Sequence, residues 1–303
     1  MIEFPPQNSQ TLLLDGAIGT AIIERTHSYD HNLWTSGFNL TDSEIVKSVH
    51  LSYLEAGADI ITTNTFRTNY TAFIQSGIKI SYSDFVKAGV KPALDAKDEF
   101  LSTAGIEAKT IIIAGSNSPA EDCYQKDRTL SPGEIKTNHE MHIMELMNSG
   151  VDIILNETHS HLDEIEIICG ICEQLHAPYI ISLYLDDNLS LLSGESIEVA
   201  LEMLNRYSTN LICFNCISPL QFSKLLKRIN LPVNWGYYLN CGIGNLENGI
   251  IECSINEDEY QRIAEDSLKY NPKLIGGCCG SNYKHIKSLR KLLDEKSVHE
   301  IAR

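Results

Sequence analysis

The chain has 303 residues and a formal net charge of −16, with 43% apolar and 21% charged residues. This is the composition of a globular protein, and it excludes intrinsic disorder, collagen and coiled coil. The acidic excess repels nucleic-acid phosphates and anionic lipid, so we expect neither nucleic acid nor membrane as a partner. Residues 1–6 carry an acid and two prolines where a signal peptide has positive charge and an apolar core. We therefore expect an intracellular, cytoplasmic protein.

Short β-branched apolar runs recur along the chain, each followed by a longer amphipathic stretch. The runs are almost continuously apolar, as expected for parallel strands that are covered on both faces. They predict strands at 12–15, 59–66, 110–117, 152–158, 179–185, 210–216, 234–240 and 274–279.

Eight helices are predicted between and after these strands. Residues 41–44 (TDSE) form a capping box that opens a helix, and Gly57 ends it. Residues 131–132 (SP) open another helix with proline at its first helical position, and Gly150 ends that one. The remaining helices are expected near 83–99, 161–175, 195–207, 219–229, 256–270 and 283–296.

Eight strands that alternate with eight helices are the count of a (β/α)8 TIM barrel, an α/β fold. We predict one such domain over residues 1–303, with an open doubly wound sheet as the alternative. In a barrel the active site forms at the carboxyl ends of the strands. The predicted strand ends are rich in polar and thiol groups, and they include four of the nine cysteines: Cys216, Cys241, Cys278 and Cys279.

The cysteines are the first candidates for chemistry, because thiols in a reducing compartment are seldom paired as disulfides. Cys278 and Cys279 are adjacent and flanked by glycines, which allow the strand end to kink so that both sulfurs face inward. Cys216 ends the sixth predicted strand and is a candidate third thiolate. Three cysteines with an open fourth position describe a catalytic zinc site. Burial of the cysteines as small hydrophobic residues is the alternative.

The remaining paired cysteines are expected to be structural. Cys169 and Cys172 are three residues apart in a predicted helix rich in isoleucine, where core packing is the preferred interpretation. Cys213 and Cys216 have the spacing of half a zinc ribbon, but a partner pair lies too far away in the sequence. We therefore expect Cys213 to pack in the barrel wall.

Histidines provide a competing metal site. His159 and His161 follow the fourth predicted strand, where such a pair can bind a hydrolytic metal in a barrel. His139 and His142 lie in a predicted helix, but they are three residues apart, whereas the HExxH zinc signature needs four. We interpret these histidines as solvated loop or helix-cap residues.

Asp15 and Glu157 are carboxylates at the ends of the first and fourth predicted strands. A pair of acids at an active-site edge suggests acid–base work or the binding of an ammonium group. A helix N-cap or a surface charge is the alternative for each. Residues 16–20 (GAIGT) lack a Walker lysine, and we expect them to close the first strand tightly so that backbone can approach a ligand.

Together these residues resemble the homocysteine S-methyltransferase family, with a similarity that extends from about residue 11 to 293. The motifs are residues 15–20 (DGAIGT), 63–66 (TNTF), 156–158 (NET), 214–216 (FNC) and 276–280 (GGCCG). The family is a zinc-dependent (β/α)8 barrel. The resemblance implies that Cys216, Cys278 and Cys279 bind zinc and that the homocysteine sulfur fills the open position.

The same resemblance implies that Asp15 and Glu157 hold the amino group of homocysteine. Asn215 belongs to the motif of the first zinc ligand and is expected to bind substrate as well. A free thiol has a pKa of about 8.5 and is mostly protonated at neutral pH, whereas coordination to zinc deprotonates it. The thiolate then attacks a donor methyl group in line and gives methionine and the demethylated donor. We therefore expect a stand-alone methyltransferase of methionine biosynthesis.

The methyl donor is expected to be a small sulfonium, S-methylmethionine or S-adenosylmethionine. Residues 239–242 (LNCG) depart from the Pro-Asn-Ser-Gly of sulfonium-using relatives, and residues 63–66 are more similar to the homocysteine module of cobalamin-dependent methionine synthase. The alternatives are thus a betaine-type donor, or a homocysteine-activating subunit that needs a corrinoid protein partner. Less favoured alternatives are a metal hydrolase built on His159 and His161 and a zinc-buffering protein.

Three aromatic residues are candidates for cation–π contact with a sulfonium: Trp34, Tyr70 and Tyr238. Packing in the core or at the rim is the preferred interpretation for each of them. The same zinc chemistry also suits selenohomocysteine or another small thiol as the acceptor.

Overall fold

The structure is a computed structural model that describes residues 4, 11–30, 32–104, 110–243 and 252–301. Apart from Phe4, the N-terminal residues that we used to argue against a signal peptide lie outside this range. None of the described helices is both long and apolar enough to cross a lipid bilayer.

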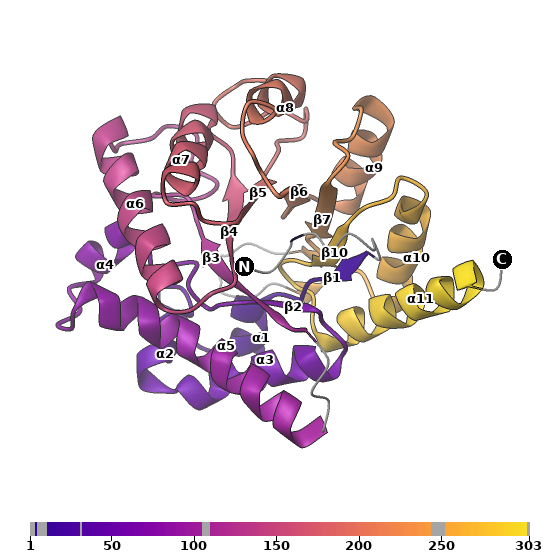
Figure 1. Cartoon of the computed structure of the whole chain (residues 1–303), viewed down its shortest axis with the longest axis horizontal. Helices are drawn as coiled ribbons and strands as arrows, with labels where there is room; N and C mark the ends of the chain where they lie inside the picture. The colour runs from indigo at the N-terminus through magenta and orange to yellow at the C-terminus, as the bar shows by residue number, and fades with distance from the viewer. Residues whose placement is uncertain (1–3, 5–10, 31, 105–109, 244–251, 302–303) are drawn as a thin grey trace.

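Eight parallel strands form an inner barrel, and helices surround it (Figure 1). The hydrogen-bonded order is β1-β10-β7-β6-β5-β4-β3-β2. A parallel bridge between Leu14 and Ile60 joins the two ends of this order, and the Asp15 N–H donates to the Ile60 carbonyl at 3.0 Å. The predicted (β/α)8 barrel is therefore confirmed, and the open sheet is excluded.

All eight predicted strands are present, although most are shorter than expected. They are β1 (Leu12–Leu13), β2 (Ile60–Thr62), β3 (Ile112–Asn117), β4 (Ile153–His159), β5 (Tyr179–Leu183), β6 (Leu211–Asn215), β7 (Trp235–Leu239) and β10 (Leu274–Gly277). The largest difference is at β2, which ends at Thr62, whereas the prediction continued to residue 66. Thr63 still makes one backbone bond to β3, from its N–H to the Ala114 carbonyl at 2.9 Å. Further along, a side chain makes the link, because the Thr65 hydroxyl donates to the Ser116 carbonyl at 2.8 Å.

The eight predicted helices are also present. They are α3 (Ser43–Glu55), α5 (Tyr82–Ala104), α6 (Pro132–Asn148), α7 (Leu162–Gln174), α8 (Ile197–Leu204), α9 (Pro219–Arg228), α10 (Glu257–Leu268) and α11 (Tyr283–Ile301). The predicted start of α6 is confirmed, with Pro132 in the first turn and a full capping box between Ser131 and Glu134. The capping box predicted at residues 41–44 is wrong, because the Asp42 side chain caps α3 by accepting the Ile45 N–H at 3.3 Å.

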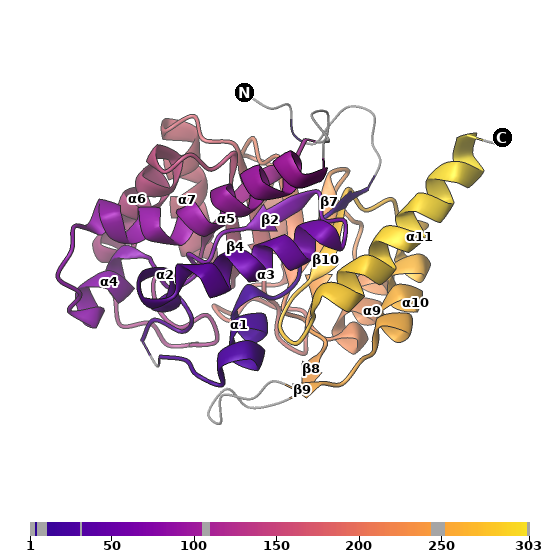
Figure 2. The same cartoon turned by 90° about the horizontal axis from the view of Figure 1, so that it is seen from below.

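Five short elements were not predicted. Three are helices, α1 (Ile18–Thr26), α2 (Phe38–Thr41) and α4 (Tyr70–Ser76). The other two form an antiparallel hairpin outside the barrel sheet, β8 (Gly242–Ile243) and β9 (Glu252–Cys253). Figure 2 shows α1 and the hairpin at the same end of the barrel. This is the end to which β7 leads, so these elements frame the carboxyl ends of the strands.

Two layers of apolar side chains make the core. The inner layer fills the barrel with residues from alternate strand positions, among them Leu14, Ile60, Leu155 and Cys213. The outer layer lies between the strands and the helices and includes Cys169 and Cys172 of α7. This arrangement follows from the strand period of two, which turns neighbouring side chains to opposite faces. The structural interpretation of these three cysteines is confirmed, since all are fully buried.

Candidate metal centre and substrate pocket

A cavity of about 450 Å³ opens among the loops that follow the barrel strands. Five of the six site residues predicted from the sequence line it: Asp15, Glu157, Cys216, Cys278 and Cys279. Asn215 does not line the cavity, although it precedes Cys216 directly. The barrel therefore brings together residues from the ends of β1, β4, β6 and β10, as the strand-end argument predicts.

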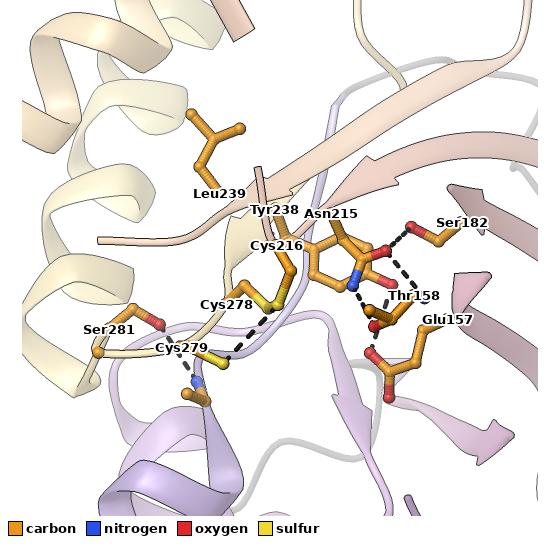
Figure 3. The surroundings of a disulfide bond; sticks show 12 residues. Glu157, Thr158, Ser182, Asn215, Cys216, Tyr238, Leu239, Cys278, Cys279 and Ser281 are labelled. Carbon is orange, nitrogen blue, oxygen red and sulfur yellow. Dashed lines mark hydrogen bonds between the residues drawn. A yellow bond between two sulfur atoms is a disulfide. The ribbon is translucent and has the colours of Figure 1, made fainter. Parts of the chain in front are cut away.

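The three cysteine sulfurs lie within 4.8 Å of one another. Cys216 follows β6, and Cys278 and Cys279 follow β10, so the cluster spans the end of β7 between them. The backbone of β7 holds both sides: the Cys216 N–H donates to the Tyr238 carbonyl at 3.3 Å and the Cys278 N–H to the Leu239 carbonyl at 2.8 Å. Cys216 and Cys278 are joined by a disulfide, and the Cys279 sulfur points toward them (Figure 3).

The donor set of this cluster fits a catalytic zinc ion. Zinc–sulfur bonds of about 2.3 Å in a tetrahedral site place two sulfurs about 3.8 Å apart. The sulfurs of Cys216 and Cys279 lie 3.7 Å apart. Three protein ligands are also the number that catalytic zinc sites use. Metal binding requires Cys216 and Cys278 as reduced thiolates, so the disulfide and a bound zinc exclude each other.

Tight backbone packing brings the two adjacent cysteines to the cavity. Gly280 has a φ of +81°, in the left-handed region, as expected for a glycine that turns the chain after the cysteines. Gly276 instead lets the backbone pack closely against Leu14, because a Cβ at position 276 would lie 2.6 Å from the Leu14 Cβ. Cys216 itself has a φ of +53°, which is strained for a non-glycine residue. The expected kink is therefore present at Gly280, with a second one at Cys216.

Asp15 is buried at the bottom of the cavity and accepts two hydrogen bonds from Thr62, from its N–H at 2.8 Å and its hydroxyl at 3.1 Å. Burial raises the pKa of Asp15 well above its usual range, and the nearby charge of Glu157 raises it further. The Thr62 bonds oppose this shift, because they stabilise the ionised form.

Glu157 lies on the same cavity wall. Its carboxylate accepts a short hydrogen bond from the Ser116 hydroxyl and a longer one, 3.4 Å, from the Tyr238 hydroxyl. Burial raises the pKa of Glu157 to about 7. Among the described residues, neither Glu157 nor Asp15 forms an ion pair with a lysine or arginine. Arg67 also lines the cavity, but its guanidinium pairs with Asp122 at 3.3 Å. Within the described part of the chain, Asp15 and Glu157 therefore remain without a cationic partner and attract a positively charged group.

Asn215 holds the end of β4 in place. Its side-chain oxygen accepts the Thr158 N–H at 3.0 Å and the Ser182 hydroxyl at 2.8 Å, and its amide N–H donates to the Thr158 hydroxyl at 2.8 Å (Figure 3). Thr158 has a φ of +65° and follows Glu157 directly. These bonds position the Glu157 segment, and a direct contact of Asn215 with substrate stays a prediction.

Aromatic side chains form much of the remaining cavity wall. Trp34 and Tyr238 line it, together with Tyr29, whose ring centroid lies 5.4 Å from that of Trp34. Tyr70, the third aromatic candidate, lies in α4 with its ring 5.1 Å from that of Tyr82 and does not line the cavity. The pocket therefore combines anionic side chains with aromatic rings, a pairing that suits a cation.

The interpretation of the histidines as solvated is wrong, whereas the helix-cap position is confirmed for His161, the N-cap residue of α7. His139, His142 and His159 are completely buried, and His161 is 7% exposed. His139 contacts Glu164 at 2.8 Å, and the remaining three bond to other buried partners: His142 to Asn117, His159 to the Asn117 carbonyl and His161 to the Lys126 carbonyl. Burial lowers the pKa of His142 to about 3 and that of His159 to about 4.

These histidines form a buried hydrogen-bonding network. Among the described residues, no cluster of potential metal ligands includes His159 or His161. Polar atoms in a core need partners, and here helix α7, the end of β3 and the loop that carries Lys126 supply them. The structure therefore gives no support to a hydrolytic metal site at this position.

The supporting side chains were not predicted. Thr62, Ser116 and Tyr238 bind the two carboxylates, and each lies on a strand next to the cavity. Ser116 and Thr62 are polar residues near strand ends, and that signal was available in the sequence. The sequence did not indicate which of these residues binds which acid.

Comparisons with known proteins give the chain its relatives. The family model described as "Homocysteine S-methyltransferase" matches residues 12–293. Homocysteine S-methyltransferase 1 of Brassica oleracea var. italica is 25% identical over 309 residues, with 94% of each chain covered. Betaine-homocysteine S-methyltransferase of Drosophila melanogaster is 28% identical over 299 residues, with 88% of each covered.

A solved structure has the same fold. The metallated form of the homocysteine methyltransferase MmuM from Escherichia coli superposes with a TM-score of 0.79 at 23% identity. The alignment covers 93% of this chain and 96% of the MmuM chain. At this identity the likeness concerns the fold alone.

Proposed function

The chain belongs to the homocysteine S-methyltransferase family of methyltransferases, and on that basis we propose that it methylates the thiol of homocysteine with a small sulfonium donor. Zinc would be held by Cys216, Cys278 and Cys279. Asp15 and Glu157 would bind the substrate ammonium group. The product is methionine, so the reaction belongs to methionine biosynthesis. We further propose that residues 1–303 form one catalytic domain.

This proposal rests on one observation: a cluster of thiols and a pair of acids line the same cavity. The thiol cluster lies beside the buried Asp15 and the partly buried Glu157, and neither acid has a cationic partner among the described residues. Homocysteine carries a thiol and an ammonium group on one short chain. A site for it therefore needs a thiol-binding end and an anionic end within a few bonds of each other.

Zinc bound by the three cysteines would supply Lewis acidity that keeps a coordinated thiol deprotonated at neutral pH. The chain's own residues do the rest of the binding. Asp15 accepts hydrogen bonds from the substrate ammonium group, with Thr62 fixing the carboxylate in position. Glu157 accepts from the same group, held by Ser116 and Tyr238. The ammonium charge in turn favours the ionised form of both acids and lowers their pKa values.

The transfer itself moves one methyl group and neutralises two charges. A carbon–sulfur bond forms between the homocysteine thiolate and the donor methyl, and the methyl–sulfonium bond breaks with its electron pair remaining on the donor sulfur. An anion and a cation thus become two neutral thioethers. Aromatic walls such as Trp34 and Tyr29 favour the cationic donor by cation–π contact and exclude water from the reacting groups.

The identity of the methyl donor is the most specific element of the proposed function. A sulfonium is small, needs no second protein, and carries the charge that the cavity attracts. Betaine shares the cationic charge, and methyl transfer from a corrinoid protein needs a partner; these are the alternatives. The thiol chemistry requires reduced cysteines, so we propose that the enzyme works in the cytoplasm.

The test is methionine formation by reduced, zinc-loaded protein with homocysteine and one donor at a time. The donors are S-methylmethionine, S-adenosylmethionine, betaine and methylcobalamin. We expect turnover with a sulfonium, and we expect Cys216→Ser to abolish it together with bound zinc. Cys213→Ala is the matched control, because Cys213 lies on β6, three residues before Cys216, but packs inside the barrel. Turnover with betaine or methylcobalamin alone would overturn the donor assignment, and no methionine from any donor would overturn the proposal.

A further inference from the structure

A second cluster of potential metal ligands lies next to the cavity but does not line it. Cys241, Cys253 and His285 place two thiol sulfurs and an imidazole nitrogen within 4.8 Å of one another. Cys241 lies between β7 and β8, Cys253 ends β9, and His285 lies in the first turn of α11. The proposed methyl transfer uses none of these side chains. Their convergence from three separate segments therefore needs its own explanation.

The distances within the cluster fit a tetrahedral metal ion. A zinc–sulfur bond of about 2.3 Å and a zinc–nitrogen bond of about 2.0–2.1 Å place the sulfur and the nitrogen about 3.6 Å apart. The Cys253 sulfur lies 3.5 Å from Nε2 of His285. The Ile255 carbonyl oxygen is 3.0 Å from the Cys253 sulfur and 2.8 Å from the same Nε2. In the metal-free protein this oxygen accepts from both groups, and metal binding would require the sulfur and Nε2 to give up these two hydrogens.

The surroundings hold the imidazole in a ligating orientation. The His285 ring is buried and packs edge-on against Tyr260, with centroids 5.6 Å apart. In the metal-free protein Nδ1 of His285 accepts the Asn282 backbone N–H at 3.3 Å, and it lies 3.1 Å from the side-chain oxygen of Asn282. That oxygen can accept the Nδ1 hydrogen once Nε2 binds a metal, as the second partner of metal-bound histidines commonly does.

The β8–β9 hairpin is held to Cys241 by hydrogen bonds. Ser254 follows Cys253, and both its N–H and its hydroxyl donate to the Cys241 carbonyl, at 2.8 and 3.0 Å. Cys253 is exposed, whereas Cys241 and His285 are buried, so a metal ion can enter from solvent on one side. Packing as a small hydrophobic residue accounts for Cys241 but not for an exposed cysteine beside a histidine nitrogen.

We propose that Cys241, Cys253 and His285 form a second zinc site, separate from the catalytic one, with a fourth position open to solvent. On binding, the two thiols release two protons, and the histidine stays neutral with its hydrogen on Nδ1. The two thiolates then balance the charge of the divalent ion. The ion joins the β8–β9 hairpin to the start of α11.

The proposed second site adjoins the catalytic loop. The Cys241 N–H donates to the Cys279 carbonyl at 2.9 Å, so the segment that carries the second site also supports a proposed ligand of the first. We expect loss of the second ion to lower the thermal stability of the protein while methyl transfer remains measurable.

Zinc per chain, measured by elemental analysis on the reduced full-length protein, tests this proposal. We expect His285→Ala and Cys253→Ser each to contain one zinc fewer than the wild type. Cys169→Ala on α7 is the matched control and should keep the wild-type number. The exposed position of Cys253 makes Cys253→Ser the variant to use if His285→Ala fails to fold. Equal zinc content in wild type and both variants would overturn the proposal, as would a Cys241–Cys253 disulfide that persists under reductant.

A second measurement isolates this site from the catalytic one. In the Cys216→Ser background, added zinc chloride should raise the unfolding temperature by a few degrees. The same addition should have no effect in the Cys216→Ser, Cys253→Ser double variant. If the catalytic zinc assignment alone is wrong, Cys216→Ser keeps the wild-type zinc content while Cys253→Ser still loses one. If the second site alone is wrong, the pattern is reversed.

Discussion

Replacing Glu157 by glutamine tests the proposed ammonium site through stability as well as through activity. Burial raises the pKa of Glu157 from 4.5 to about 7. Because the folded-state pKa lies above the unfolded one, the folded protein binds this proton more tightly between those two pH values. The stabilisation is fully present below pH 4.5 and is lost as the pH rises to about 7. At about 1.4 kcal/mol for each pH unit, the loss amounts to about 3 kcal/mol.

Glu157→Gln removes this charge and keeps a side-chain oxygen for Ser116. We therefore expect the substrate-free variant to be more stable than the wild type at pH 8, by up to about 3 kcal/mol. The gap should shrink as the pH falls toward 5. Urea unfolding of both proteins at several pH values measures it, with Glu198→Gln on the exposed surface of α8 as the control. A gap that does not depend on pH would refute the assigned burial cost.

The same substitution should weaken homocysteine binding. A hydrogen bond to a charged group contributes about 1.5–3 kcal/mol, so kcat/KM for homocysteine should fall about 10- to 100-fold. 4-Mercaptobutanoate, which is homocysteine without its amino group, is the matched substrate, and its kcat/KM should change little. An equal loss with both thiols would show that Glu157 acts on something other than the ammonium group.

Three further outcomes follow from the geometry. Cys279→Ser should remove the catalytic zinc and lower methionine formation by at least about 1000-fold, measured by elemental analysis and product assay; retained zinc would contradict the ligand assignment. Asn215→Ala leaves the N–H and hydroxyl of Thr158 without their partner; we expect a loss of about 2–3 kcal/mol in urea unfolding together with a lower kcat. Gly276→Ala would place a Cβ 2.6 Å from the Leu14 Cβ; the expected loss of about 1–3 kcal/mol is measured in the same way, and an unchanged midpoint would contradict it.

The barrel could be predicted because its strands are buried on both faces. Such strands leave nearly unbroken apolar runs, and all eight were found in order. Helix α1 was missed for a tertiary reason. Gly19 lies inside this helix, where glycine is unfavourable, and the sequence around it suggested a turn. In the structure the Trp34 indole occupies the space that a Cβ at position 19 would need.

The buried histidines show what a sequence pattern lacks. A polar residue after a strand is typical of a solvent-exposed loop. The sequence therefore predicts that His159 and His161 are exposed to solvent. In the folded chain their partners lie 42 and 35 residues away, at the Asn117 and Lys126 carbonyls. Because these partners are distant in the sequence, nothing local distinguishes a buried imidazole from a solvated one.

The two cysteine clusters differ in whether the sequence predicts them. Cys216, Cys278 and Cys279 stand at strand ends, where the barrel geometry guarantees that they meet. Cys241 also follows a strand, but Cys253 lies on a hairpin that was not predicted and His285 on the first turn of a helix. Their meeting depends on how the hairpin folds back toward α11. No spacing rule along the chain describes this contact.

Strain in the backbone links the two halves of the substrate pocket. Thr158 and Cys216 adopt left-handed φ values of +65° and +53°, at the ends of β4 and β6. Such conformations cost about 1–3 kcal/mol each and persist only where the surroundings impose them. Asn215 precedes Cys216 in the chain and binds Thr158 through both its amide groups. Glycine would relieve the strain at Cys216 but would remove the thiol. One asparagine therefore fixes the distance between the acid at position 157 and the sulfur at position 216, the two ends between which homocysteine would have to fit.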